Sequence, residues 1–208
     1  MPLAEKTAWG FFLSKRFHIF APRWQIWYIE NRKMTPTEQL KTEHEAIKRM
    51  LKILENIVER LAKDESVPKD DLNRIVEFIR VFADSCHHAK EENVLFRKLE
   101  NEGMSKETGP IGVMLSEHQE GRGFVLGMEN GLNKKDLFIQ NARNYINLLS
   151  QHIEKEEMIL YPMADRTLSA ETQSQILKEF DQIETEKIGS GKHDEFHRLL
   201  DRLEKIYL

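Results

Sequence analysis

Six residues of metal-ligating types stand at regular positions in this chain of 208 residues. Two His-x-x-x-Glu pairs put an imidazole and a carboxylate one turn apart on the same face of a helix, so both side chains of a pair reach one centre. Two further histidines occur singly, on other stretches with helical periodicity. The candidate metal ligands are His44, His88, Glu92, His118, His152 and Glu156.

The four histidines of this set are spaced evenly about the expected turns. In antiparallel neighbouring helices, two residues lie at the same height when both are equally far from the connecting turn. The midpoint of His44 and His88 is residue 66, in an expected turn. The midpoint of His88 and His118 is residue 103, a glycine, and that of His118 and His152 is residue 135, close to the next turn. The spacing therefore predicts that all four imidazoles share one layer of an up-and-down bundle, where facing helices build metal sites.

The elements that must position these residues are amphipathic helices. Apolar residues recur every three or four positions along four long stretches, and Pro or Gly residues separate the stretches. We expect long helices from about residue 36 to 64, from the Pro68 turn to about 101, from about 110 to 130, and over a fourth stretch that contains residues 145 to 163. Shorter helices are expected over about 170 to 186 and 193 to 206. The pattern predicts an all-α fold, an up-down-up-down four-helix bundle with one or two extra C-terminal helices.

The chemistry of the inner positions favours a metal site. A glutamate in a bundle interior is rare unless it is paired or ligates a metal, because an unpaired buried charge is costly. Imidazoles and carboxylates without thiolates suit iron or manganese, and zinc is also compatible with them. Two glutamates that can each bridge, Glu92 and Glu156, suit a pair of metals. The lone cysteine, Cys86, excludes a disulfide framework and fits a reducing, cytoplasmic compartment.

A second register is available on the helix that carries His88, because His87 and Glu91 have the same spacing. The charged residues Arg80, Asp84 and Lys98 lie seven positions from this second pair, whereas the apolar residues Val81, Leu95 and Leu99 lie seven positions from His88 and Glu92. This difference favours His88 and Glu92 as the inner pair. We therefore expect His87 beside the site, and Glu91 in solvent or behind the ligands.

Two histidines near the C-terminus, His193 and His197, also lie one turn apart. One interpretation is that their helix folds back and supplies a ligand to the site. The alternative is a surface helix, because charged residues surround the two histidines and a separate apolar stripe provides the packing face. The sequence leaves this choice open.

Charge and hydropathy exclude two classes of partner. The net charge of -4 and the pI near 6.1 give no electrostatic reason for nucleic-acid binding, which depends on clustered basic residues. No stretch approaches the 18 uncharged apolar residues that a spanning helix needs, so no transmembrane segment is predicted. The protein partner is left open.

A shift in composition divides the chain at residue 33. Residues 1–33 hold all three tryptophans and carry six basic and two acidic side chains, a charge of +4, whereas the rest carries 25 basic and 33 acidic ones, a charge of -8. We expect an N-terminal extension over 1–33, a metal-binding bundle over 34–166 and a helical appendage over 167–208. The extension has three interpretations: untranslated sequence upstream of an initiator Met34, an aromatic membrane-surface anchor, or a packing arm.

The order of the candidate ligands resembles the hemerythrin-like family, or HHE cation-binding domain. A lone His, a His-x-x-x-Glu pair, a lone His and a second His-x-x-x-Glu pair follow one another over roughly residues 34–166. The segments CHHAKEENVLF (86–96) and MLSEHQEGR (114–122) are similar to the bacterial branch of this family.

This resemblance implies a non-haem di-iron centre, with two oxo- or hydroxo-bridged irons per chain, terminal histidines, and Glu92 and Glu156 as bridges. The implied ligand is O2 or a related diatomic molecule or peroxide, in sensing, iron or oxygen handling, or a stress response; whether the chain is an enzyme is left open. Oxygen-carrying hemerythrins have a second histidine where this chain has Arg122, which puts reversible oxygen carriage in doubt. The alternatives are a di-iron protein of iron-sulfur cluster repair under nitrosative stress, and a metal-free helical scaffold.

Overall fold

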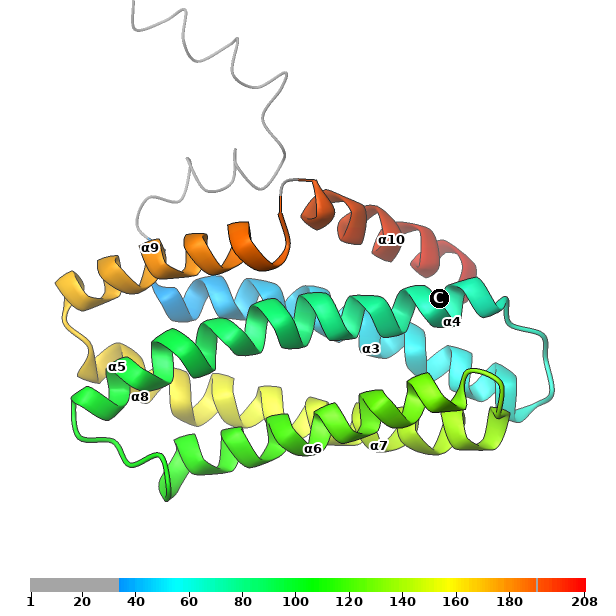
Figure 1. The fold of residues 1–208 in the computed structure, drawn as a ribbon, viewed down its shortest axis with the longest axis horizontal. Coiled ribbons are helices and arrows are strands. Elements are labelled where there is room, and N and C mark those ends of the chain that lie inside the picture. Colours follow the sequence, from blue (N-terminus) through cyan, green and yellow to red (C-terminus); the bar gives the residue numbers. More distant parts are fainter. Residues whose placement is uncertain (1–33, 190) are drawn as a thin grey trace, which may run out of the picture. The chain divides into compact units, whose positions relative to one another are not determined.

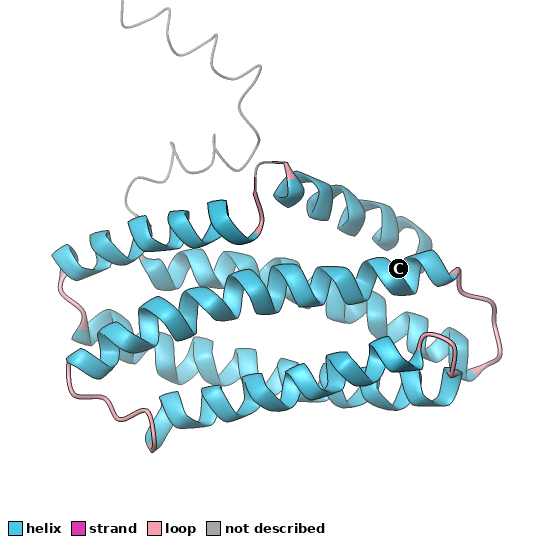
Figure 2. Ribbon diagram, viewed as in Figure 1, coloured by secondary structure: helices cyan, strands magenta, loops and turns pink. Residues whose placement is uncertain are grey.

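The computed structural model describes residues 34–189 and 191–208, and its regular structure over these residues is entirely helical. Residues 35–208 form one compact unit. Four long helices, joined by short turns at alternating ends, make a bundle, and two shorter C-terminal helices pack on it (Figures 1 and 2). The predicted all-α four-helix bundle with extra C-terminal helices is confirmed. The interpretations of residues 1–33 fall outside the described residues and stay predictions.

Each of the four bundle helices has bounds close to those expected. The first is α3 (Pro36–Ala62) and the third is α6 (Gly109–Gly131). The second and the fourth are each continuous helices in which α-helical and π-helical segments alternate. The second comprises α4 (Lys69–Phe78), η2 (Ile79–His88), η3 (Glu91–Leu95) and α5 (Phe96–Asn101); the fourth comprises α7 (Lys135–Lys155), η4 (Glu156–Leu160) and α8 (Tyr161–Thr167). The C-terminal helices are α9 (Ala170–Lys187) and α10 (Lys192–Tyr207).

Local signals fix where the first bundle helix begins. The Thr35 hydroxyl accepts a hydrogen bond from the Glu38 amide at 3.2 Å, and the Glu38 carboxylate accepts one from the Thr35 amide at 2.7 Å. This reciprocal cap, with Pro36 at the first helical position, satisfies amides that the helix itself leaves unpaired. The helix therefore starts at a defined residue, which sets the height of every inner side chain along it.

The π-helical segments lie where the polar inner residues were expected. A π-helical turn pairs residue i with i+5 and so holds more residues than an α-helical turn, and such turns are common at functional sites. The consequence is greatest in η2, where the adjacent His87 and His88 are 1% and 4% exposed. Two neighbouring residues of one helix thus both face the interior.

The apolar core is divided into two clusters by the polar layer. In each bundle helix, apart from Ile153 directly after His152, the inner apolar side chains on one side of the histidines belong to one cluster and those on the other side to the second. In α3, for example, Leu40 belongs to the smaller cluster and Ile47 to the larger, with His44 between them. Side chains of α10 join the larger cluster, and Ile176 and Phe180 of α9 join the smaller one. Apolar packing on both sides therefore holds the polar layer in place, away from water. Among the described residues, no helix is long and apolar enough to cross a membrane.

Candidate metal centre

The polar layer contains two groups of buried ligand-type side chains. The three-histidine group consists of His88, Glu91, His118 and His152, and the two-histidine group consists of His44, His87, Glu91 and Glu156. Within each group, one donor atom per residue lies within 4.8 Å of every other. Glu91 belongs to both groups, so the two groups adjoin.

Glu156 connects the two groups through its two carboxylate oxygens. Its Oε1 lies 3.1 Å from Nε2 of His152 and 3.9 Å from Nε2 of His118, and its Oε2 lies 3.2 Å from Nε2 of His44. The side chain is fully buried. A carboxylate with one oxygen toward each group has the placement of a bridge between two cations.

Glu91 has a similar place between the groups. Its Oε2 lies 3.4 Å from Nε2 of His118 and 3.7 Å from Nε2 of His87. Its Oε1 accepts a hydrogen bond of 2.7 Å from the hydroxyl of Tyr161, which also lies 3.2 Å from Nε2 of His44. The Tyr161 hydroxyl therefore orients Glu91 from the side of the two-histidine group.

Every histidine of the two groups has a carboxylate behind it. In each case an Asp or Glu oxygen lies at hydrogen-bond distance from Nδ1, which leaves Nε2 directed at the centre. Because an ionised carboxylate only accepts, each Nδ1 is the donor. The pairs are His44 with Glu157 (2.9 Å), His87 with Glu43 (2.9 Å), His88 with Asp84 (3.4 Å), His118 with Glu92 (2.7 Å) and His152 with Glu117 (2.9 Å). Carboxylates in this role orient metal-binding imidazoles and raise their basicity.

Several inner atoms of the layer are buried without a hydrogen-bond partner among the described residues. They are Nε2 of His88, Oε2 of Glu91 and both carboxylate oxygens of Glu156. Leaving buried charged oxygens unsatisfied is costly, so such atoms call for a group that pairs with them. Cations placed among these donors would satisfy all four atoms. The residues present therefore fit a pair of metal ions.

Without a metal, protons occupy part of this layer. Burial would lower the pKa of His44, but the adjacent carboxylates of Glu156 and Glu157 raise it to about 9. Burial acts the same way on His152, and the charge of Glu156 together with a hydrogen bond to Glu117 raises its pKa to about 10. Burial would raise the pKa of Glu156 itself, but the two imidazolium groups hold it well below its usual value. Protons and a metal thus compete for the same atoms.

Five of the six sequence-predicted residues are brought together in the layer, namely His44, His88, His118, His152 and Glu156. The sixth, Glu92, belongs to neither group. It is half-buried, and its Oε1 accepts hydrogen bonds of 2.7 Å from Nδ1 of His118 and from Nη2 of Arg122. Glu92 therefore lies behind a histidine of the three-histidine group.

The expectation that Glu91 faces solvent is wrong, because Glu91 is 0% exposed. Glu91 belongs to both groups, and the choice between Glu91 and Glu92 as a metal ligand stays a prediction. His87, which was expected beside the site, lies within the two-histidine group. The physical reason is the π-helical path of η2 and η3, since counting in sevens assumes uniform α-helical turns. One signal in the sequence could have pointed to Glu91. It lies four residues after His87 and three after His88, so its carboxylate is about one helical turn from both imidazoles.

The two C-terminal histidines contribute to neither group. His193 and His197 pack against each other, with ring centroids 4.6 Å apart, and the His193 ring lies 5.7 Å from that of Phe82 in η2. Their helix, α10, contributes to the larger apolar cluster through other side chains. The surface-helix interpretation describes their place better than the interpretation as ligands.

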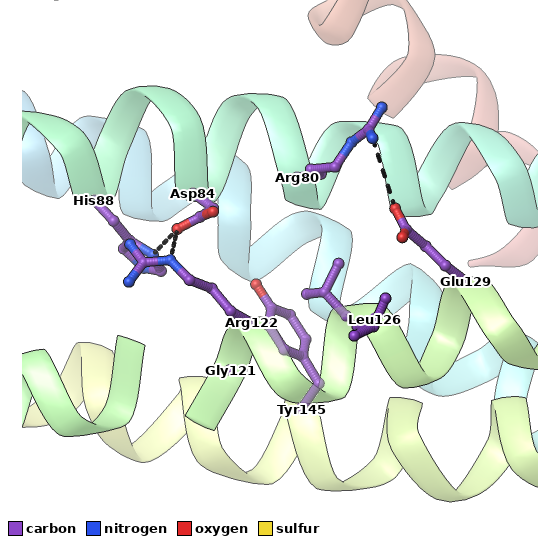
Figure 3. Close-up of a pocket in the computed structure, with 9 residues that line it drawn as sticks. Arg80, Asp84, His88, Gly121, Arg122, Leu126, Glu129 and Tyr145 are labelled. Carbon is purple, nitrogen blue, oxygen red and sulfur yellow. Dashed lines mark hydrogen bonds and ion pairs between the residues drawn. The ribbon is translucent and has the colours of Figure 1, made fainter. Parts of the chain in front are cut away.

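A pocket of about 260 Å³ opens beside the three-histidine group, between the second and third bundle helices. Its lining includes His88, Asp84, Gly121, Arg122 and Tyr145 (Figure 3). Nε of Arg122 donates to Asp84 at 2.7 Å, which is the carboxylate behind His88. Since Arg122 also donates to Glu92, one guanidinium ties together the carboxylates behind two histidines of the same group.

An up-and-down helical bundle with an inner layer of histidines and glutamates that can hold cations defines a helical cation-binding protein. The family model described as the Hemerythrin HHE cation binding domain matches residues 35–164, and the chain belongs to this family. Similar relatives include uncharacterized proteins of Mycobacterium bovis and of two strains of Mycobacterium tuberculosis. Each is 28% identical over 181 residues, which cover 83% of this chain and 69% of the relative. No solved structure matches the chain.

Proposed function

We propose that this chain is a non-haem di-iron protein whose site interacts with O2 or a related small oxidant. In this proposal Glu91 and Glu156 would both hold the two irons, since each lies between the two groups. His88, His118 and His152 complete one ligand set, and His44 and His87 the other. The observation that carries the proposal is the convergence of five Nε2 atoms, each backed at Nδ1, on two shared carboxylates whose inner oxygens have no other partner among the described residues.

The donor types are compatible with iron and differ from those of a structural zinc site. Among the described residues the two groups contain imidazoles and carboxylates and no thiolate, which suits iron or manganese better than a structural zinc site. When bound in such a set, iron supplies one-electron redox chemistry and affinity for dioxygen and related molecules. The protein's part is to hold the donors, keep water out and orient protons.

The place of His87 in the two-histidine group raises the number of candidate histidine ligands from four to five. The sequence indicated that Arg122 leaves the third bundle helix one imidazole short of the oxygen-carrying pattern. In this proposal His88, from the second bundle helix, supplies the third imidazole beside His118 and His152, because His87 joins His44 in the other ligand set. The presence of Arg122 then no longer argues against oxygen binding, and its role is to hold Asp84 and Glu92 in place.

Two features of the chain support chemistry with a small molecule. The pocket beside His88 is large enough for a diatomic molecule or a peroxide, and it reaches the edge of the three-histidine group. At the other group, burial and the charges of Glu156 and Glu91 raise the pKa of Tyr161 well above its usual value, so its hydroxyl keeps its proton. That proton is held in a hydrogen bond to Glu91, directly beside the donors.

The proposal is tested on the full chain loaded anaerobically with ferrous iron, by elemental analysis and by spectra in air and after reduction. We expect two irons per chain and near-ultraviolet charge-transfer bands that bleach on reduction. Retention of manganese or zinc in preference to iron would contradict the choice of metal. If the chain retained no metal at all, the layer would be a structural device that sets the register of the helices, and the proposal would fail.

A further inference from the structure

Helix α9 lies beyond the segment that matches the family model, yet one of its side chains reaches the layer of ligands. Ile176, Phe180 and Glu184 follow one another at four-residue intervals and so share one face of the helix. Ile176 and Phe180 are fully buried in the smaller apolar cluster, and they are the two fully buried side chains of α9. The third residue on this face, Glu184, is acidic, and it forms a hydrogen bond with a buried lysine of the bundle.

That partner is Lys90, which stands between the metal-site residues of the second bundle helix and is 1% exposed. Its Nζ donates to Oε2 of Glu184 at 2.8 Å and to Oε1 of Glu43 at 2.7 Å. The ring of Phe180 lies 5.9 Å from the same ammonium. An ammonium out of water needs such partners, because removing one of them leaves an uncompensated buried charge.

Glu43 carries the contact on to the metal site. While its Oε1 accepts from Lys90, its Oε2 accepts from Nδ1 of His87 at 2.9 Å. Four side chains thus form an unbroken series of hydrogen bonds from α9 to the two-histidine group, in the order Glu184, Lys90, Glu43 and His87. The carboxylate that orients His87 is itself held by a lysine that α9 helps to hold.

We propose that Glu184 is a positioning residue for the two-histidine group, so that metal occupancy and the docking of α9 are thermodynamically linked. The inference rests on the proposed metal centre. If docking of α9 raises metal affinity by orienting His87, a bound metal must stabilise the docked helix by the same free energy, because linkage between two sites is reciprocal. Because only two side chains of α9 are fully buried, its local stability should be low enough for a bound metal to change it measurably.

The chain offers a matched control on the same helix. Glu179 pairs with Lys98 at 2.9 Å, and both side chains are partly exposed. Glu184→Gln and Glu179→Gln each remove one negative charge from α9 and keep the size of the side chain. Glu184→Gln weakens the series of hydrogen bonds that ends at His87, whereas Glu179→Gln changes only the partly exposed pair with Lys98.

The first measurement is made on the metal-free full chain, by nitrogen-15 NMR of the imidazole of His87, assigned by its loss in His87→Gln. We expect the His87 signals to move in Glu184→Gln and to stay in place in Glu179→Gln. A residue that merely held α9 in place would leave the His87 imidazole unchanged. Unmoved His87 signals in Glu184→Gln would overturn the inference.

The second measurement uses ferrous iron. Loss of a carboxylate directly behind a ligand typically lowers metal affinity about 10- to 100-fold, and Glu184 lies further out, so we expect a loss of about three- to tenfold in Glu184→Gln and none in Glu179→Gln. Iron should also slow amide hydrogen exchange in α9 of the unmodified chain, and less so in Glu184→Gln. Equal affinities in the two variants, with exchange in α9 indifferent to iron, would overturn the inference. A chain that binds no iron while its His87 signals move in Glu184→Gln would refute the di-iron proposal and leave the positioning role supported.

Discussion

Two cations hold the carboxylates around the site, and they do so in different surroundings. On the pocket side, Arg122 ties Asp84 and Glu92 together at the edge of the protein, where all three side chains are partly exposed. On the inner side, the buried Lys90 ties the buried Glu43 to Glu184, whose side chain is 22% exposed. We call these the Arg122 triad and the Lys90 triad.

The two triads differ in the burial of the cation, and so in what the loss of that cation should cost. Breaking a buried ion pair typically costs about 3–5 kcal/mol, because the remaining charge stays buried and unsolvated. An exposed pair is worth about 0–1 kcal/mol. The Lys90 triad should therefore matter for the stability of the fold as well as for the metal. The Arg122 triad should affect metal affinity more than the stability of the fold, since water can solvate its charges when the pairs are broken.

The largest effect is expected from Lys90→Met. This change leaves Glu43 buried without the ammonium that, against the effect of burial, lowers its pKa to about 2. We expect the free energy of unfolding of the metal-free chain to fall by about 3–5 kcal/mol at neutral pH, measured by denaturant titration. The matched control is Lys48→Met, which removes a partly exposed partner of Glu157 and should cost less than about 1 kcal/mol. Equal losses in the two variants would break the contrast between buried and exposed cations.

A smaller effect is expected from Arg122→Lys, which keeps the charge but removes the fork that reaches Asp84 and Glu92 together. We expect iron affinity to fall about tenfold, with the free energy of unfolding of the metal-free chain changed by less than about 1 kcal/mol. Competition with a chelator measures the first quantity and denaturant titration the second. A large loss of stability with unchanged affinity would show that the two triads do not differ in the way inferred.

The sequence predicted more of the fold than of the ligand set. Helix periods and turn residues gave the four bundle helices, and the equal distances of the histidines from the turns gave the layer. Counting by heptads placed Glu91 outside the core, and the structure buries it in both groups, because such counting assumes one helical period, whereas η2 and η3 take a wider one. Nor could the carboxylates behind the histidines be picked out, because Glu43 and Glu117 share their residue type with many solvent-facing glutamates of the chain. Their role follows from neighbours that are distant in the sequence.

The pH dependence sharpens the comparison by showing whether both groups hold protons. In the metal-free chain the pKa of His44 is raised to about 9 and that of His152 to about 10, so both are protonated at neutral pH. A raised folded-state pKa adds stability that is fully present below the unfolded value near 6.5 and is lost as the pH rises through the folded value. The metal-free chain should therefore lose stability between about pH 7 and pH 10.

Metal uptake must displace these protons, so iron affinity should increase with pH over the same range. Calorimetric titration at pH 7.5 in buffers of different ionisation enthalpy measures the number of protons released. We expect net release, with one contribution from each group. A heat of binding independent of the buffer would show that the imidazoles are already neutral before the metal arrives.

The central claim is that two buried carboxylates, Glu91 and Glu156, hold two irons between the histidine groups, with Glu92 outside the ligand set. Its most direct test is the iron content of Glu91→Gln and Glu92→Gln, measured beside the unmodified chain after anaerobic ferrous loading and removal of free iron. We expect two irons in the unmodified chain, two in Glu92→Gln with lower affinity, and no more than one in Glu91→Gln. Loss of iron from Glu92→Gln with full retention in Glu91→Gln would contradict the claim and restore the register that the sequence favoured.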